Sequence, residues 1–272
     1  MKPLTPVLLL LALSGCSSSV VPNFTQTCPQ FFANPDGIVS PPTVFQRQNY
    51  KQICQMQNNT YEFATLYDTA NRIPVYSAYK FEGIMGCKRK TNWHIEPQLD
   101  NSAAGGRMGP DRKIALPNQA VKADYTGTSN HGYEKGHLAP VYHARSQSCS
   151  NATFTLTNAA PQNCSFNHGK WETTEIAVAN YLVKNCSPNN STFIVTGVVP
   201  GPKKLKNRVR IPSHFWTAFC CLDNNLKVKA SRGFLGKNKN DPVQNMTISN
   251  LEGELSNLYG TVFSVFGGRL AS

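Results

Sequence analysis

Nine cysteines constrain the fold of this 272-residue chain more than any other feature of its sequence. If the first of them leaves with an export signal, eight remain, and an even set in an exported chain predicts about four disulfides. The pairing stays open, because eight cysteines can be joined in many ways. Adjacent Cys220 and Cys221 are expected to bond different partners, since neighbouring residues of a strand face opposite sides. The nine are Cys16, Cys28, Cys54, Cys87, Cys149, Cys164, Cys186, Cys220 and Cys221.

The N-terminus predicts export. Met1-Lys2 precedes an apolar run from Val7 to Leu13 and a small-residue stretch, which is typical of a secretory signal peptide over residues 1–18. The run is too short to span a membrane, and no later segment is apolar for long enough, so we expect a secreted, extracellular protein without a transmembrane segment. Leu13-Ser14-Gly15-Cys16 also fits a bacterial lipoprotein box, which stays as an alternative. Sequons for N-glycosylation favour the secretory interpretation, and they begin at Asn23, Asn58, Asn151, Asn163, Asn185, Asn189, Asn190 and Asn245.

The net charge of the chain favours negatively charged binding partners but does not identify one of them. The sequence has 27 Lys and Arg against 15 Asp and Glu, a formal net charge of +12, while 40% of its residues are hydrophobic. That hydrophobic share excludes a disordered or fibrous chain. The basic balance favours polyanionic partners such as nucleic acid, anionic lipid or glycans.

One α+β domain is the simplest organisation of the chain. Residues 19–55 are rich in Pro, Asn and Gln and are predicted to form an extended lead-in to a domain over 56–272. Runs of β-branched and aromatic residues predict strands at 73–81, 153–157, 192–199, 214–222 and 226–234. Spaced apolar residues predict helices at 166–182 and 248–259. Gly and Pro predict a long loop at 98–118 and a basic loop at 203–210 that follows a strand stop at Pro200.

Most of the candidate catalytic and metal-binding residues lie between Asp124 and Glu175. That region contains Tyr133-Glu134-Lys135-Gly136-His137-Leu138-Ala139-Pro140, then Thr157-Asn158-Ala159-Ala160-Pro161-Gln162, then Phe166-Asn167-His168-Gly169-Lys170-Trp171 and Glu175. In order and spacing, these motifs resemble the DNA/RNA non-specific endonuclease family. Trp93-His94-Ile95-Glu96-Pro97-Gln98-Leu99 further resembles a secreted vertebrate branch of that family, and the resemblance covers roughly residues 60–265.

The resemblance implies an α+β fold with a central antiparallel sheet, flanking helices and a ββα-metal finger as the active site. It implies a metal-dependent enzyme that hydrolyses DNA and RNA phosphodiester bonds with little sequence preference. His137 is expected to be the general base, because a neutral imidazole with a pKa of about 6.5 can accept a proton from water. Asn167 is expected to bind Mg²⁺ directly, with Mn²⁺ as the alternative, since hard cations prefer oxygen ligands. Glu175 would hydrogen-bond waters of the metal, and Asn158 would shape the site beside His137.

Three positions depart from the family's pattern. Glu134-Lys135 stands where the family has Asp-Arg, so Lys135 keeps the positive charge but loses the bidentate fork of arginine. Thr91 and Ala179 each stand where the family has an arginine. The sequon at Asn163 lies inside the motif region, where a glycan would crowd the site, so we expect it to be unused; a glycan there would count against catalysis.

Basic side chains near the motifs and in the later loop are expected to bind substrate phosphates. They are Lys135, Arg89, Lys90, Lys203 and Lys204. The departures leave two alternatives to an enzyme open. One is a catalytically weak or inactive nuclease-fold protein that binds extracellular nucleic acid or another polyanion. The other is a secreted interaction protein whose basic face binds glycans or a protein partner. The oligomeric state is not predicted.

Overall fold

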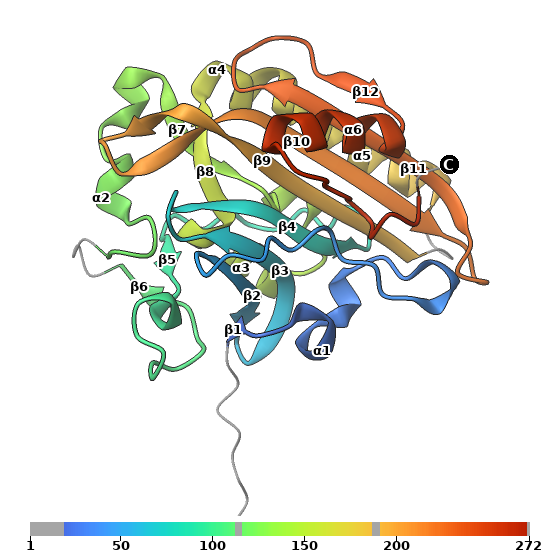
Figure 1. The fold of residues 1–272 in the computed structure, drawn as a ribbon, viewed down its shortest axis with the longest axis horizontal. Helices are drawn as coiled ribbons and strands as arrows, with labels where there is room; N and C mark the ends of the chain where they lie inside the picture. The colour runs from blue at the N-terminus through green and yellow to red at the C-terminus, as the bar shows by residue number, and fades with distance from the viewer. Residues whose placement is uncertain (1–18, 112–115, 187–190, 271–272) are drawn as a thin grey trace, which may run out of the picture.

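The computed structural model describes residues 19–111, 116–186 and 191–270, and the predicted signal peptide lies outside them. Its centre is an eight-stranded sheet in the order β1-β2-β3-β4-β9-β10-β11-β12 (Figure 1). Every neighbouring pair is antiparallel, which confirms the predicted α+β fold with a central antiparallel sheet. The strands are β1 Val20–Val21, β2 Tyr50–Gln57, β3 Thr60–Asp68, β4 Ile73–Phe81, β9 Ser191–Leu205, β10 Val209–Leu222, β11 Val228–Lys237 and β12 Gln244–Met246.

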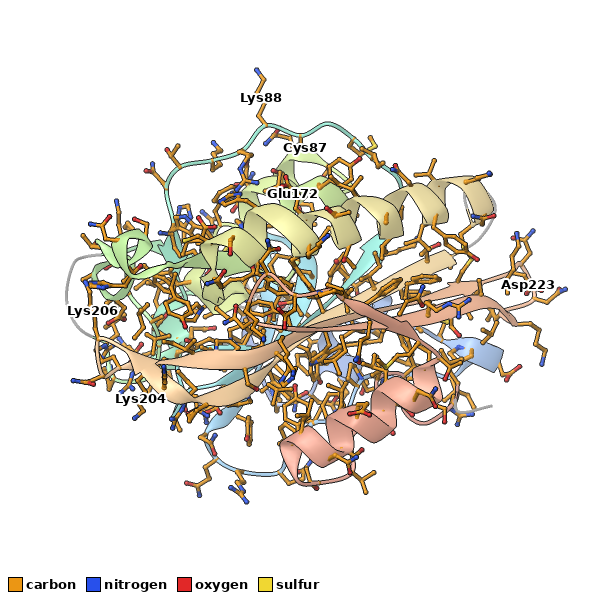
Figure 2. All side chains as sticks on the ribbon, turned by 90° about the horizontal axis from the view of Figure 1, so that it is seen from above. Cys87, Lys88, Glu172, Lys204, Lys206 and Asp223 are labelled. Carbon is orange, nitrogen blue, oxygen red and sulfur yellow. A yellow bond between two sulfur atoms is a disulfide. The ribbon has the colours of Figure 1, made fainter. Side chains whose placement is uncertain are left out.

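Helices cover both faces of the sheet, and the alternation of β10 explains why both faces are apolar. Trp216 and Ala218 pack in the cluster that contains α6 (Ile248–Tyr259). Phe219 faces the other way and packs with α5 (Glu172–Asn185). Figure 2 shows these two helices on opposite sides of the strands. The predicted helix 248–259 and the predicted strand 73–81 have the observed bounds of α6 and β4.

The segment predicted as an extended lead-in is integrated into the core. It contains β1, the short helix α1 (Phe24–Thr27) and the start of β2. Phe24 and Phe31 are about 1% exposed and pack in the same cluster as α6. A disulfide between Cys28 and Cys54 joins the end of α1 to β2. The apolar residues among the Pro, Asn and Gln therefore form part of the sheet's cover.

Two disulfides are formed among the described residues, against the four expected. The second joins Cys186, after α5, to Cys221 on β10. Cys220 and Cys221 do face opposite sides, as predicted, but Cys220 is a buried free thiol in the α6 cluster, so the expectation of a disulfide there is wrong. The other free thiols in this part of the chain are Cys87, Cys149 and Cys164.

A smaller ββα unit packs beside the large sheet. Strands β7 (Tyr133–His137) and β8 (Ala159–Asn163) form an antiparallel pair. The chain then enters α4 (Cys164–Phe166), a π-helical turn (Asn167–Trp171) and α5. The remaining elements are β5 His94–Ile95, β6 Gly109–Pro110, α2 Lys122–Tyr125 and α3 Gln147–Ala152. No helix among the described residues is long and apolar enough to cross a membrane.

Three predictions of local structure from the sequence are wrong, each for a physical reason. Residues 153–157 are not a strand: a 3-10 turn covers Leu156–Asn158, and the hydroxyls of Thr155 and Thr157 bond each other at 3.1 Å instead of lying along a ladder. Pro200 does not end its strand either, because it pairs with Pro212 where the register shifts, a place at which proline is tolerated. The predicted basic loop 203–210 is consequently a β-hairpin.

Candidate functional site

A cavity of about 650 Å³ lies between the ββα unit and the loop that precedes β5. It gathers six of the predicted site residues from four segments of the chain. These are Arg89, Lys90, Lys135, His137, Asn167 and Glu175. Asn158, Lys203 and Lys204 are not among the residues that line it.

The β7–β8 pairing places His137 at the cavity. His137 is the last residue of β7 and pairs with Ala159 of β8, while Gly136 pairs with Ala160. A β-carbon on Gly136 would overlap the side chain of Gln162, which crosses the strand at that point. The glycine of the Lys-Gly-His motif therefore permits the close approach that sets the position of the histidine.

His137 is held as a neutral imidazole. Its ring packs against Trp93 and Phe154, with ring centroids 4.7 and 5.0 Å apart. Burial lowers its pKa to about 3, and the charges of Arg89 and Lys135 act in the same direction. Its Nε2 is buried and has no hydrogen-bond partner. His137 lines the cavity, and a neutral imidazole can take a proton from a bound water.

Asn167 begins the π-helical turn, and its amide is oriented by Glu134. Asn167 Nδ2 donates to Glu134 Oε1 at 2.9 Å, and the same oxygen lies 2.7 Å from His168 Nε2. With the amide nitrogen bound in this way, the side-chain oxygen is the group left for a cation. Glu172 and Glu175 line the same cavity, so the available donors are oxygen atoms of the kind that Mg²⁺ prefers. The residues present fit the predicted metal.

Glu175 lies on the next turns of the same helix and is fixed by a buried histidine. The imidazole of His143 bridges Tyr79 Oη and the backbone oxygen of Glu175, each at 2.9 Å. Burial, and then the carboxylate of Glu172, raise the pKa of the Glu175 carboxyl to about 8. A positive charge beside such a carboxyl would favour its ionised form. This environment suits a side chain that works next to a bound cation.

Two of the predicted cations are held by aromatic rings at the cavity. Lys135 Nζ lies 5.5 Å from the ring centroid of Trp93 and 5.4 Å from that of Tyr125. Burial, and then the charge of Lys122, lower its pKa. The guanidinium of Arg89 lies 5.7 Å from the ring of Phe154. Cation–π contacts of this kind fix the position of a charge that would otherwise be mobile.

The basic hairpin is a separate feature. Lys206 donates to two backbone oxygens of α2 and the turn after it, and Arg208 forms an ion pair with Asp124 at 2.8 Å. In Figure 2, Lys204 and Lys206 lie at one end of the molecule, whereas Lys88 stands above α5. The hairpin charges therefore serve the fold in part, and a role in binding substrate stays a prediction for Lys203 and Lys204.

Asn158 braces the chain behind His137. It is fully buried, and its Oδ1 accepts from the backbone nitrogen of Ala139 and from Ser77 Oγ, each at 2.9 Å. Its Nδ2 donates to the backbone oxygens of Ala139 and Thr153 at 3.0 Å. With its amide bound on both sides, Asn158 is a positioning residue for the segment after β7.

Several residues of the cavity were not predicted to belong to the site. Glu134 and His168 flank Asn167, and Tyr142 and Ile176 form an exposed apolar part of the lining. The signal for Glu134 was present, because an acidic residue stands two positions before Gly136 in the motif. The departure at position 179 also has a structural reason: Ala179 is fully buried in the α5 cluster, where an arginine has no room.

A large antiparallel sheet that carries a ββα unit, with a histidine ending its first strand and an asparagine opening its helix, defines the ββα-metal class. The sequence agrees: residues 40–258 match the DNA/RNA non-specific endonuclease family, and the chain belongs to that family. One chain of the crystal structure of the EndoG/EndoGI complex has the same fold. It superposes with a TM-score of 0.51 at 20% sequence identity, over 75% of this chain and 83% of that one.

Relatives in the family differ in length. The chain is 32% identical over 189 residues to the human Endonuclease domain-containing 1 protein, which is 67% of this chain and 37% of the relative. The mouse protein of the same name is 31% identical over the same length. A nuclease of Nostoc sp. is 26% identical over 225 residues, which is 79% of this chain and 72% of that protein. The alignment with the two mammalian proteins thus covers little more than a third of their length.

Proposed function

We propose that this chain is an exported, metal-dependent endonuclease that hydrolyses DNA and RNA. The observation that carries the proposal is a buried, neutral His137 whose Nε2 has no hydrogen-bond partner, in the lining of a cavity that also carries Arg89, Lys90 and Lys135. A binding protein does not need a desolvated, unpaired imidazole there, because burying a polar atom without a partner costs free energy. The predicted signal peptide and the two disulfides support export.

The chemistry follows from the positions of these side chains. Lys135 and Arg89 attract the phosphate to the wall formed by Trp93 and Phe154. His137 takes the proton from the attacking water as the water oxygen bonds to phosphorus. The bond from phosphorus to the leaving nucleotide oxygen breaks, and that oxygen takes a proton from solvent. Asn167 would hold Mg²⁺, and Glu134 and Glu175 would bind its waters. The metal, when bound, neutralises the charge that builds on the phosphate oxygens.

Plasmid DNA and a folded RNA, each incubated with the purified chain and Mg²⁺ or Mn²⁺, test this function. We expect cleavage with metal, no cleavage with EDTA, and a loss of about 100-fold or more in His137→Ala. His131→Ala is the matched control, because His131 is an exposed histidine outside the cavity. No cleavage by the folded chain with either metal, together with nucleic-acid binding that is the same with metal and with EDTA, would overturn the proposal in favour of a binding protein with a nuclease fold.

A further inference from the structure

The lining of the cavity also has an apolar part that the mechanism above does not use. Tyr142 and Ile176 are each 38% exposed and both line the cavity. Tyr142 precedes His143 in the chain, and Ile176 follows Glu175. The hydrogen bond from His143 to the backbone oxygen of Glu175 therefore brings the segments of Tyr142 and Ile176 together. A large aromatic and a large aliphatic side chain thus form an exposed apolar part of the lining of the cavity that contains His137.

Tyr142 is mounted rigidly. It lies in the 3-10 turn Val141–His143, and the next residue is fixed through both ring nitrogens, to Tyr79 Oη and to the backbone of Glu175. The turn follows directly after the segment that Asn158 braces. The backbone of Tyr142 is therefore held at the cavity by a structured turn, and a ligand that stacks on its ring would lose little entropy in ordering the backbone.

The charged side chains of the cavity suggest different positions for the phosphate and the base of a nucleotide. The cations Arg89 and Lys135 lie against the aromatic residues around His137 and attract phosphate. The wall formed by α5 carries Glu172 and Glu175 beside Ile176, so that wall does not attract phosphate on its own. A neutral, flat group is the chemistry that suits the apolar part of the lining, and in a nucleic acid that group is the base.

We infer that Tyr142 and Ile176 form a subsite for an unpaired nucleobase next to the scissile phosphate, and that the chain prefers single-stranded substrate. The inference rests on the proposed nuclease function and names its substrate class. A base in a duplex has both faces covered by its neighbours, so only an unpaired base can offer a face to Tyr142. Stacking of a base on an aromatic side chain contributes about 1–3 kcal/mol.

Cleavage of one labelled oligonucleotide, single-stranded and annealed to its complement, tests this preference. That stacking energy corresponds to about a 5- to 150-fold loss in kcat/KM for the single strand in Tyr142→Ala. Cleavage of the duplex should be unchanged, and Tyr142→Phe should retain the wild-type rate on both. Tyr181→Ala is the matched control: Tyr181 is 44% exposed on α5 but is not a lining residue. Equal losses on single strand and duplex would overturn the inference.

A binding measurement keeps this test separate from the nuclease proposal. Fluorescence anisotropy with His137→Ala protein would compare a thymidine homopolymer with a fully abasic strand of the same length, which has the same phosphates and no bases. We expect the thymidine strand to bind more tightly, and Tyr142→Ala in the same background to remove the difference. That result supports the base subsite even if the chain cuts nothing. Equal affinity for the two strands would refute the subsite even if the chain cuts well.

Discussion

At the scale of single residues, Lys135 is the departure whose consequence can be measured most directly. Its ammonium lies over Trp93 and Tyr125, and its pKa is lowered by burial, so it loses its charge at a lower pH than an ordinary lysine. Arginine stays charged, stacks on the same rings and offers two donors to a phosphate. We expect Lys135→Arg to raise kcat/KM by about 5-fold at neutral pH, and by more as the pH rises. Rates from pH 6 to 10 check this, and a constant ratio of the two rates would contradict it.

The same scale shows what could be predicted about the site. Lys135, His137, Asn167 and Glu175 lie within one continuous stretch of motifs, and all four line the cavity. For Asn158 the motif predicts a role in shaping the site but not its form, because the pattern does not distinguish a side chain that faces the cavity from one that braces the backbone behind it. The contact between Glu134 and the residues around Asn167 joins positions 33 apart, and only the fold reveals it.

At the scale of elements, the β7–β8 pair depends on Gly136. Gln162 of β8 passes across this glycine, so the methyl group of Gly136→Ala would collide with it and separate the strands. Overpacking of this kind costs about 1–3 kcal/mol. We expect Gly136→Ala to lower the melting temperature and to reduce cleavage by displacing His137. Gly105→Ala is the control, since a β-carbon there meets no atom within 4 Å. Equal melting curves for the two variants would show that the contact of Gln162 with position 136 accommodates a methyl group.

Elements with strong local signals were predicted well. Helix α6 has Thr247 as a cap that accepts from Asn250, a buried stripe that includes Leu251 and Leu255, and Gly260 with a positive φ at its end. Such caps and stripes are local properties of a sequence. The 153–157 segment has the β-branched residues of a strand, but Thr157 accepts a hydrogen bond from Gln55, 102 positions away. A tertiary contact of that range overrides local propensity.

At the scale of the whole molecule, a buried polar network connects the start of the described chain with the site. Ser19 Oγ donates to Glu96 Oε2 at 3.1 Å, and Thr155, which lowers the pKa of Glu96, begins a series of buried side chains that ends at Asn158. Polar networks in a low-dielectric interior are stable only when their members are satisfied. The intervening members are Thr157, Gln55, Thr65 and Ser77.

Glu96 makes this network sensitive to pH. It is fully buried, its Oε1 has no partner, and burial raises its pKa from 4.5 to about 8. The folded chain therefore holds a proton that the unfolded chain releases between these two values. Stability from this group is complete below about pH 4.5 and is lost as the pH rises towards 8, by at most about 1.4 kcal/mol per pH unit. Ionisation would place an uncompensated charge in the core and weaken the network that ends at Asn158.

Glu96→Gln replaces the protonated carboxyl with a neutral amide of the same size and should remove this loss. Urea unfolding at pH 5 and pH 8, in EDTA, measures the free energy of unfolding of wild type and variant. We expect the variant to gain stability relative to wild type as the pH rises from 5 to 8. Glu254→Gln makes the same charge change at an exposed position of α6. In this control the free energy of unfolding should change between pH 5 and pH 8 by the same amount as in wild type. Other buried groups titrate in both wild type and Glu96→Gln. The difference between the two proteins in how the free energy of unfolding changes with pH therefore reports on Glu96 alone. The prediction is contradicted if the free energy of unfolding changes between pH 5 and pH 8 by the same amount in Glu96→Gln and Glu254→Gln. In that case Glu96 does not hold its proton in the folded chain, and it does not make the network pH-sensitive.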